Sequence, residues 1–69
     1  MKYVVLFEKT GTGFSAYVPD LPGCVAAGAT LEETIQLMQG AVQMHLAGMR
    51  EDREAIPEPQ TIAEYIVAA

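Results

Sequence analysis

The longest regular pattern in the chain lies in residues 30–50, which read TLEETIQLMQGAVQMHLAGMR. Apolar side chains recur here every three or four residues, the period of a helix with one buried face. Thr30 and Glu33 have the spacing of a capping box, in which the threonine hydroxyl accepts from the Glu33 amide. The stretch therefore predicts one amphipathic helix ending at about Arg50–Arg53. The expected apolar stripe contains Leu31, Ile35, Met38, Val42, His45 and Met49, widened by Leu37, Ala41, Met44 and Leu46.

Three short strands are expected before this helix. Residues 2–8 are mostly β-branched or aromatic, which favours a strand. Two glycines in residues 9–13 indicate a hairpin, and a second strand then covers residues 14–18 before Pro19 ends it. Residues 24–28 form the expected third strand, so this part of the chain is predicted to be an antiparallel meander.

A fourth strand is expected after the helix. Prolines at positions 57 and 59 oppose further helix, and residues 61–67 alternate as a strand does. Because crossover connections are right-handed, the last strand can lie parallel to the first. The prediction is one α+β domain over residues 1–69, with order βββαβ, a four-stranded mixed sheet of strand order 3-2-1-4, and one helix on one face.

Both faces of the first strand are apolar. Tyr3, Val5 and Phe7 point to one side, while Val4 and Leu6 point to the other. One helix covers only one face of such a sheet, and an uncovered apolar face usually marks an interface. We therefore expect a homodimer or higher homo-oligomer, formed through the uncovered face or an edge strand.

Charge and composition restrict the class of partner. Nine acidic residues against four basic ones give a net charge of −5, which disfavours direct nucleic-acid binding and favours a basic protein partner. No apolar run approaches the roughly 18 residues of a membrane span. No secretory signal follows Met1, and the single Cys24 has no partner for an internal disulfide. A cytoplasmic protein that binds no membrane is expected.

Catalytic interpretations are weaker than structural ones. A two-metal nuclease site needs several converging carboxylates. The candidates are Glu8, Asp20, Glu32 and Glu64. Each has an ordinary local role in a different part of the predicted fold. Cys24 and His45 are the only possible thiol–imidazole pair, and both are expected to be packing residues. We expect no enzyme activity, no metal and no cofactor.

The turn formed by Asp20, Leu21, Pro22 and Gly23 has two interpretations. Pro22 within it and Pro19 before it fully explain a stiff connector between strands. A rigid loop with an exposed Leu21 would also lose little entropy on binding a partner. Both interpretations stay open, and these four residues are the predicted partner-binding site.

Four segments together resemble the HicB-like antitoxin family. They are YVPDLPGC at 17–24, GATLEE at 28–33, MRED at 49–52 and IPEP at 56–59. The resemblance implies a degraded ribonuclease H-like domain and the role of a type II antitoxin. Members of that family bind and neutralise a small basic, mRNA-cleaving toxin of the HicA-like type, and the resemblance implies such a partner for this chain.

Some features differ from the family pattern. Many relatives add a C-terminal DNA-binding module, whereas this sequence ends at Ala69, so we expect no DNA binding from this chain alone. Ala29 stands where an acidic residue is common. Arg53 stands where a glycine commonly ends the helix, so the left-handed cap is expected to be lost or moved. An orphan homo-oligomeric regulatory or structural protein without a toxin partner fits the same sequence features.

Overall fold

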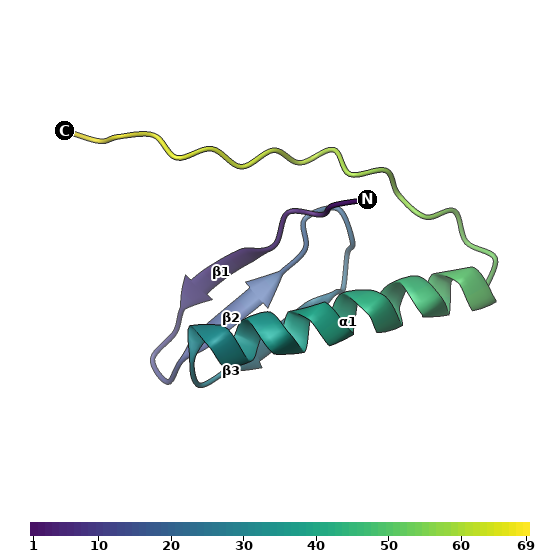
Figure 1. The fold of residues 1–69 in the computed structure, drawn as a ribbon, viewed down its shortest axis with the longest axis horizontal. Coiled ribbons are helices and arrows are strands. Elements are labelled where there is room, and N and C mark those ends of the chain that lie inside the picture. Colours follow the sequence, from purple (N-terminus) through teal and green to yellow (C-terminus); the bar gives the residue numbers. More distant parts are fainter.

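The computed structural model describes all 69 residues and contains three strands followed by one helix (Figure 1). The elements are β1 (Leu6–Lys9), β2 (Phe14–Tyr17), β3 (Val25–Gly28) and α1 (Leu31–Glu51). The strands form an antiparallel sheet of order β1-β2-β3. The α+β class, the meander and the single helix are therefore confirmed. The first strand is shorter than predicted and begins at Leu6.

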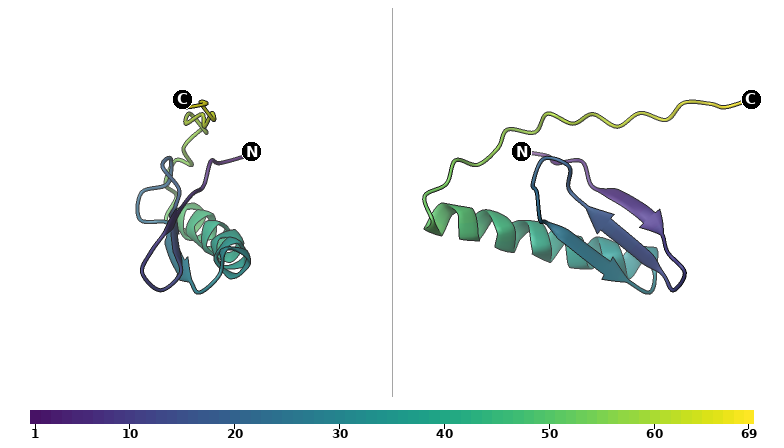
Figure 2. Two further views of the ribbon diagram at one scale, coloured as in Figure 1. Left: turned by 90° about the vertical axis from the view of Figure 1, so that its left-hand side faces the viewer. Right: turned by 180° about the vertical axis from the view of Figure 1, so that it is seen from behind.

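The sheet has one covered and one open face. The helix packs against β3 and β2 on one side (Figure 2). The core lies between them and consists of Ala16, Val18, Leu21, Cys24 and Met38. Tyr3, Val5 and Phe7 pack against this cluster, as the alternation of the first strand predicts. On the opposite face no second layer is present.

Local hydrogen bonds fix the start of α1. Thr30 caps the helix, and its hydroxyl accepts from the Glu33 amide at 3.1 Å, as predicted. Thr34 is fully buried, and its hydroxyl donates to the Thr30 carbonyl at 2.8 Å. A Cβ atom on Gly28 would lie 2.7 Å from that hydroxyl, so the glycine allows the end of β3 to approach the first helical turn.

The C-terminal end of α1 keeps a left-handed cap, contrary to the prediction. Arg53 has φ 55°, and its amide donates to the Arg50 carbonyl at 3.1 Å. The Glu54 amide donates to the Met49 carbonyl at 2.8 Å. These two bonds make a Schellman motif. The motif has therefore formed with arginine, and not glycine, in the left-handed position.

Residues 57–69, here called the C-terminal arm, are extended but belong to no strand. The sheet has three strands and not four, and β1 lies at its edge and not at its centre. The arm does run in the predicted direction, beside β1 and parallel to it (Figures 1 and 2). Its first residues are hydrogen-bonded to Tyr3 and Asp20, which lie outside β1, as described below.

The apolar stripe of the helix is narrower than predicted. Met38 is buried, and Ala41, Val42, Leu46 and Met49 pack against the core. Leu37 and Met44 are 45% and 77% exposed, so their predicted place in the stripe is wrong, and the stripe residues Leu31 and Ile35 are also exposed, at 43% and 38%. The sheet covers only part of the helix surface, and Leu37 and Met44 lie outside that part.

Candidate binding site

The turn predicted to bind a partner has a structural centre and an exposed tip. The Cys24 amide donates to the Leu21 carbonyl at 3.1 Å, and Gly23 has φ 85°. With Pro22 before that glycine, this arrangement is typical of a type II turn. Leu21 is 0% exposed and belongs to the core, so the expectation of an exposed Leu21 is wrong. Only Pro22 and Gly23 are exposed at the tip.

Asp20 holds the base of the C-terminal arm. Its carboxylate accepts from the Gln60 and Thr61 amides, both at 3.0 Å, and from the Thr61 hydroxyl at 2.9 Å. The backbone hydrogen bonds from Thr61 and Gln60 lower the pKa of this carboxyl, because they stabilise its charged form. Asp20 is therefore an anchor between two segments of the chain that are 40 and 41 residues apart.

A second anchor fixes the arm at its first residue. The Tyr3 hydroxyl donates to the Pro57 carbonyl. Tyr3 lies just before β1, so this bond joins the N-terminal segment to the base of the arm. Together the two anchors hold residues 57–61, and no hydrogen bond reaches residues 62–69.

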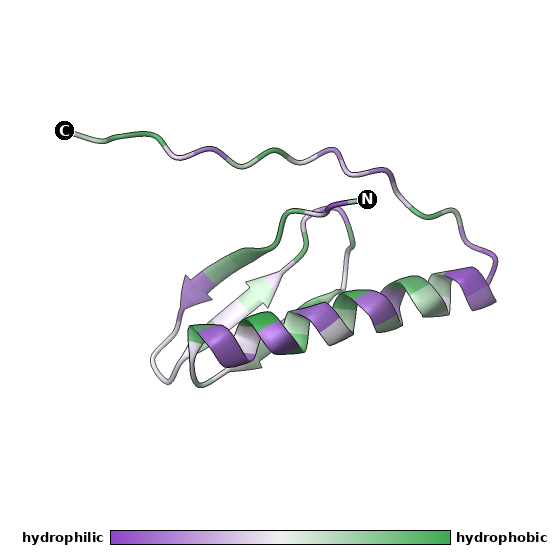
Figure 3. Cartoon of the chain, in the orientation of Figure 1, coloured by the Kyte–Doolittle hydropathy of each residue, from purple (hydrophilic) through white to green (hydrophobic).

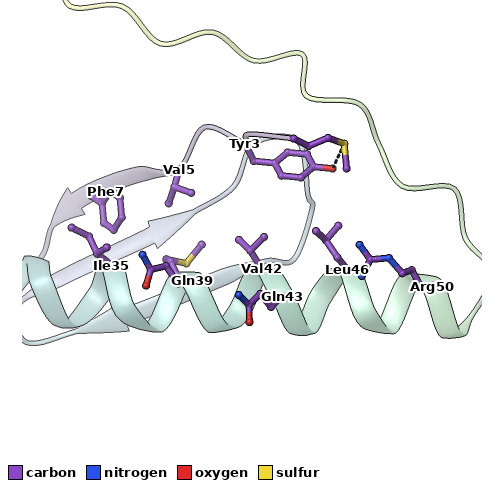
Figure 4. A pocket seen from close by; sticks show the side chains of 11 residues that line it. Tyr3, Val5, Phe7, Ile35, Gln39, Val42, Gln43, Leu46 and Arg50 are labelled. Atoms are coloured by element: carbon purple, nitrogen blue, oxygen red, sulfur yellow. Dashed lines mark hydrogen bonds between the residues drawn. The ribbon is translucent and has the colours of Figure 1, made fainter.

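An apolar groove lies between the N-terminal segment and α1. Its volume is about 670 Å³. Figure 4 shows Tyr3, Val5 and Phe7 facing Ile35, Val42 and Leu46 across it. Because the helix packs on β3 and β2, this side of the two-layer fold stays open. We call this feature the edge groove.

A second hollow separates β1 from the C-terminal arm. Its volume is about 460 Å³, and we call it the edge slot. Val5, Leu6, Phe7 and Leu31 line one side, and Ala63, Glu64 and Tyr65 line the other. The arm beyond it contains hydrophobic residues, coloured green in Figure 3, and the side chains of Ile62, Ile66 and Val67 are exposed.

The open face of the sheet carries a row of apolar side chains. Leu6 is the partner of Tyr17 in β2, and Tyr17 is the partner of Val25 in β3. Tyr17 is 41% exposed and Val25 63% exposed. This outer-face row is the uncovered apolar surface that the strand patterns predict.

The structure does not bring the candidate catalytic groups together. No group of three or more His, Cys, Asp or Glu side chains lies close enough to hold a metal ion. Cys24 is buried in the core, and this burial raises the pKa of its thiol, which disfavours the nucleophilic thiolate. His45 is half-buried on α1. No helix is long and apolar enough to cross a membrane.

Sequence reasoning missed three residues that shape this region. They are Tyr3, Thr34 and Thr61. Thr34 carries a local signal, because a threonine in the first helical turn can bond to a carbonyl four residues back. Tyr3 and Thr61 bond to distant segments, and nothing in their own neighbourhoods indicates those partners.

Comparison with known proteins gives a consistent result. The family model described as HicB-like antitoxin of bacterial toxin–antitoxin system matches residues 3–69. Antitoxin HicB 2 of Photorhabdus laumondii is 37% identical over 67 residues, covering 97% of this chain and 48% of the relative. An uncharacterized 14.9 kDa protein from the rep-hol intergenic region of Haemophilus phage HP1 is 41% identical over 66 residues, covering 96% and 50%.

A UPF0150 protein of Synechocystis is closer in length. It is 32% identical over 63 residues, covering 90% of this chain and 80% of the relative. The chain spans about half the length of the phage protein and of the Photorhabdus antitoxin. The similarity therefore covers the three strands, the helix and the arm.

Proposed function

This chain belongs to the HicB-like antitoxin family, and we propose on that basis that it acts as the antitoxin of a type II toxin–antitoxin system. In this role it binds and neutralises a small basic, mRNA-cleaving toxin of the HicA-like type. It does so as a cytoplasmic binding protein and not as an enzyme. The match over residues 3–69 is the observation that carries the proposal.

The charge of the chain supports a basic partner. A net charge of −5 attracts a cationic protein and speeds the encounter, whereas exposed apolar contacts would hold the complex. The same charge repels phosphate, so residues 1–69 alone are not expected to bind operator DNA.

Two neighbouring features form the proposed toxin contact. Pro22 and Gly23 are exposed at the turn, and the outer-face row reaches Val25 two residues later. Asp20 and Leu21 contribute by shaping the turn, since one anchors the arm and the other fills the core. A rigid turn beside exposed apolar side chains loses little entropy on binding.

A co-expression experiment tests the proposal. The toxin to be used is the product of a short neighbouring gene that encodes a small basic protein. Expression of that protein alone should stop growth and degrade mRNA, and co-expression of this chain should reverse both effects. If both effects persist while the chain accumulates in folded form, the antitoxin function is refuted.

Matched variants test the contact surface in the same assay. Val25→Glu should reduce neutralisation, because it places a charge in the outer-face row without disturbing a buried side chain. Leu37→Glu is the control, since Leu37 is also exposed but lies on the helix. If the two variants neutralise the toxin equally well, the toxin does not contact the outer-face row.

We also propose that the chain self-associates. The outer-face row and the unpaired β1 edge are both open in the single chain. A four-stranded, ribonuclease H-like sheet would form only if residues 61–67 paired with a β1 edge, and in the single chain that edge is unpaired. An orphan homo-oligomer without a toxin is the alternative function, and it would self-associate but fail the co-expression test.

A further inference from the structure

We propose that two copies of the chain exchange their C-terminal arms, so that residues 61–67 of each copy fill the edge slot of the other. The inference rests on the self-association proposed above and not on toxin binding. It identifies the occupant of the slot as the same segment of a second copy.

The first observation is the exposure of the arm. Ile62, Tyr65, Ile66 and Val67 are 82%, 103%, 86% and 97% exposed. Uncovered apolar residues on an extended segment with free backbone donors and acceptors form a template for pairing with another strand. The arm therefore has the properties of a strand whose partner lies outside its own chain.

The second observation is the incomplete sheet edge. β1 pairs only with β2, so its other edge has no strand partner. The edge slot lies along that edge, and the edge groove lies between the same strand and α1. A strand placed in the slot would satisfy the β1 backbone, and its helix-facing side chains would cover the groove.

The third observation is where the anchors hold the arm. Asp20 and Tyr3 fix residues 57–61, and the arm then continues along the β1 side of the sheet (Figure 2). In this position the arm lines the far side of the slot with Ala63, Glu64 and Tyr65. A strand within the slot would therefore have β1 on one side and this arm on the other.

Two-fold symmetry makes the exchange self-consistent. The arm runs parallel to β1 (Figure 1). A two-fold axis normal to the sheet makes the arm of the second copy antiparallel to the arm of the first. Each arm can then lie between the partner's β1 and the partner's arm and pair with both. The result is one continuous eight-stranded sheet with both helices on the same face, a closed dimer of the domain-swapped kind.

The alternation of the arm indicates which side chains fill the groove. Ala63, Tyr65 and Val67 share one face, and Ile62 and Ile66 share the other with Glu64. Burying an unpaired carboxylate is costly, so the uncharged set is assigned to the helix side. Tyr65 then supplies the largest side chain to the groove.

Sedimentation of the full chain tests the association. The wild-type chain should be a dimer at micromolar concentration. Ala63→Pro should be monomeric with an unchanged helical circular dichroism signal, because proline removes a ladder donor within the exchanged segment. Ala69→Pro is the matched control outside that segment and should stay dimeric.

A second variant guards against misfolding of the first. Tyr65 is fully exposed in the single chain, so Tyr65→Ser leaves the fold of that chain intact. Losing the burial of this aromatic side chain should weaken dimerisation by about a hundredfold. A monomeric wild type, or a Tyr65→Ser variant that dimerises as tightly as wild type, would overturn the proposal.

Cross-linking separates exchange from other modes of association. A tagged chain with Glu64→Cys is refolded together with an untagged chain with Glu8→Cys and treated with a bis-maleimide. Cys24 can stay in place, because it is buried and its thiol pKa is raised. A covalent product between the tagged and untagged chains is expected.

The remaining outcomes also decide the question. A doubly substituted chain that links only within itself would show the arm paired with its own β1, which refutes exchange. A dimer that forms no inter-chain link would show that the copies associate through the outer-face row and do not exchange arms. Toxin neutralisation is measured separately from association. If the chain is monomeric and still neutralises the toxin, arm exchange is refuted and the antitoxin function is not. If the chain forms the exchanged dimer but does not neutralise the toxin, the antitoxin function is refuted and arm exchange is not.

Discussion

Replacing Leu21 by alanine tests whether the turn at residues 20–23 stabilises the core in addition to any contact with a partner. Leu21 is 0% exposed and contacts the cluster that includes Met38. Burial of a leucine side chain contributes about 1.5–3 kcal/mol, and the cavity left behind adds to this loss. We therefore expect Leu21→Ala to lower the free energy of unfolding by about 2–5 kcal/mol.

That loss is large for a chain of this size. A domain of 69 residues has a free energy of unfolding of roughly 3–10 kcal/mol at the usual value per residue. Urea denaturation followed by circular dichroism, at fixed protein concentration and low temperature, measures the change. Leu37→Ala is the matched control, since Leu37 is 45% exposed, and it should cost under about 1 kcal/mol. If the two substitutions cost the same, Leu21 is not the core residue described above.

Three further predictions concern the helix ends and the arm. Arg53→Gly should stabilise the fold by about 1 kcal/mol in urea denaturation, because φ 55° strains any side chain; a destabilised variant would contradict the Schellman cap. Thr30→Ala should cost about 1 kcal/mol in the same assay by removing the bond to the helix amide, and no change would mean that the cap is not stabilising. The pKa of Asp20 is lowered in the folded chain, so its carboxylate is charged and holds the arm at neutral pH. These hydrogen bonds are lost as the pH falls below about 4, the ordinary pKa of an aspartate, and through the lowered pKa of the folded chain. Amide chemical shifts of Gln60 and Thr61 should titrate together in that range in wild type and not in Asp20→Asn.

Local signals in the sequence determined most of the fold. The Thr30 cap depends on a residue three positions away, and the turn at Pro22 and Gly23 depends on adjacent residues, so both could be predicted. The alternation of Tyr3, Val5 and Phe7 likewise predicted which side chains face the helix.

The wrong prediction of an exposed Leu21, and the contacts that the sequence did not predict, have non-local causes. The burial of Leu21 follows from how the turn folds back onto Met38, which no neighbouring residue encodes. The bonds from Asp20 to Gln60 and Thr61 join segments 40 and 41 residues apart. Residues 61–67 alternate as a strand does but pair with no strand in the single chain, because alternation does not determine which edge a segment joins.

If the chain self-associates as proposed, its small interior links its stability to its concentration. Only six of 69 residues are buried, so one copy hides little apolar surface from water. When a second copy supplies the missing cover, folding obeys mass action, and dilution acts in the same direction as a denaturant. The melting temperature then rises with protein concentration, and a cell that slows synthesis of this protein also shortens the survival of the molecules already made.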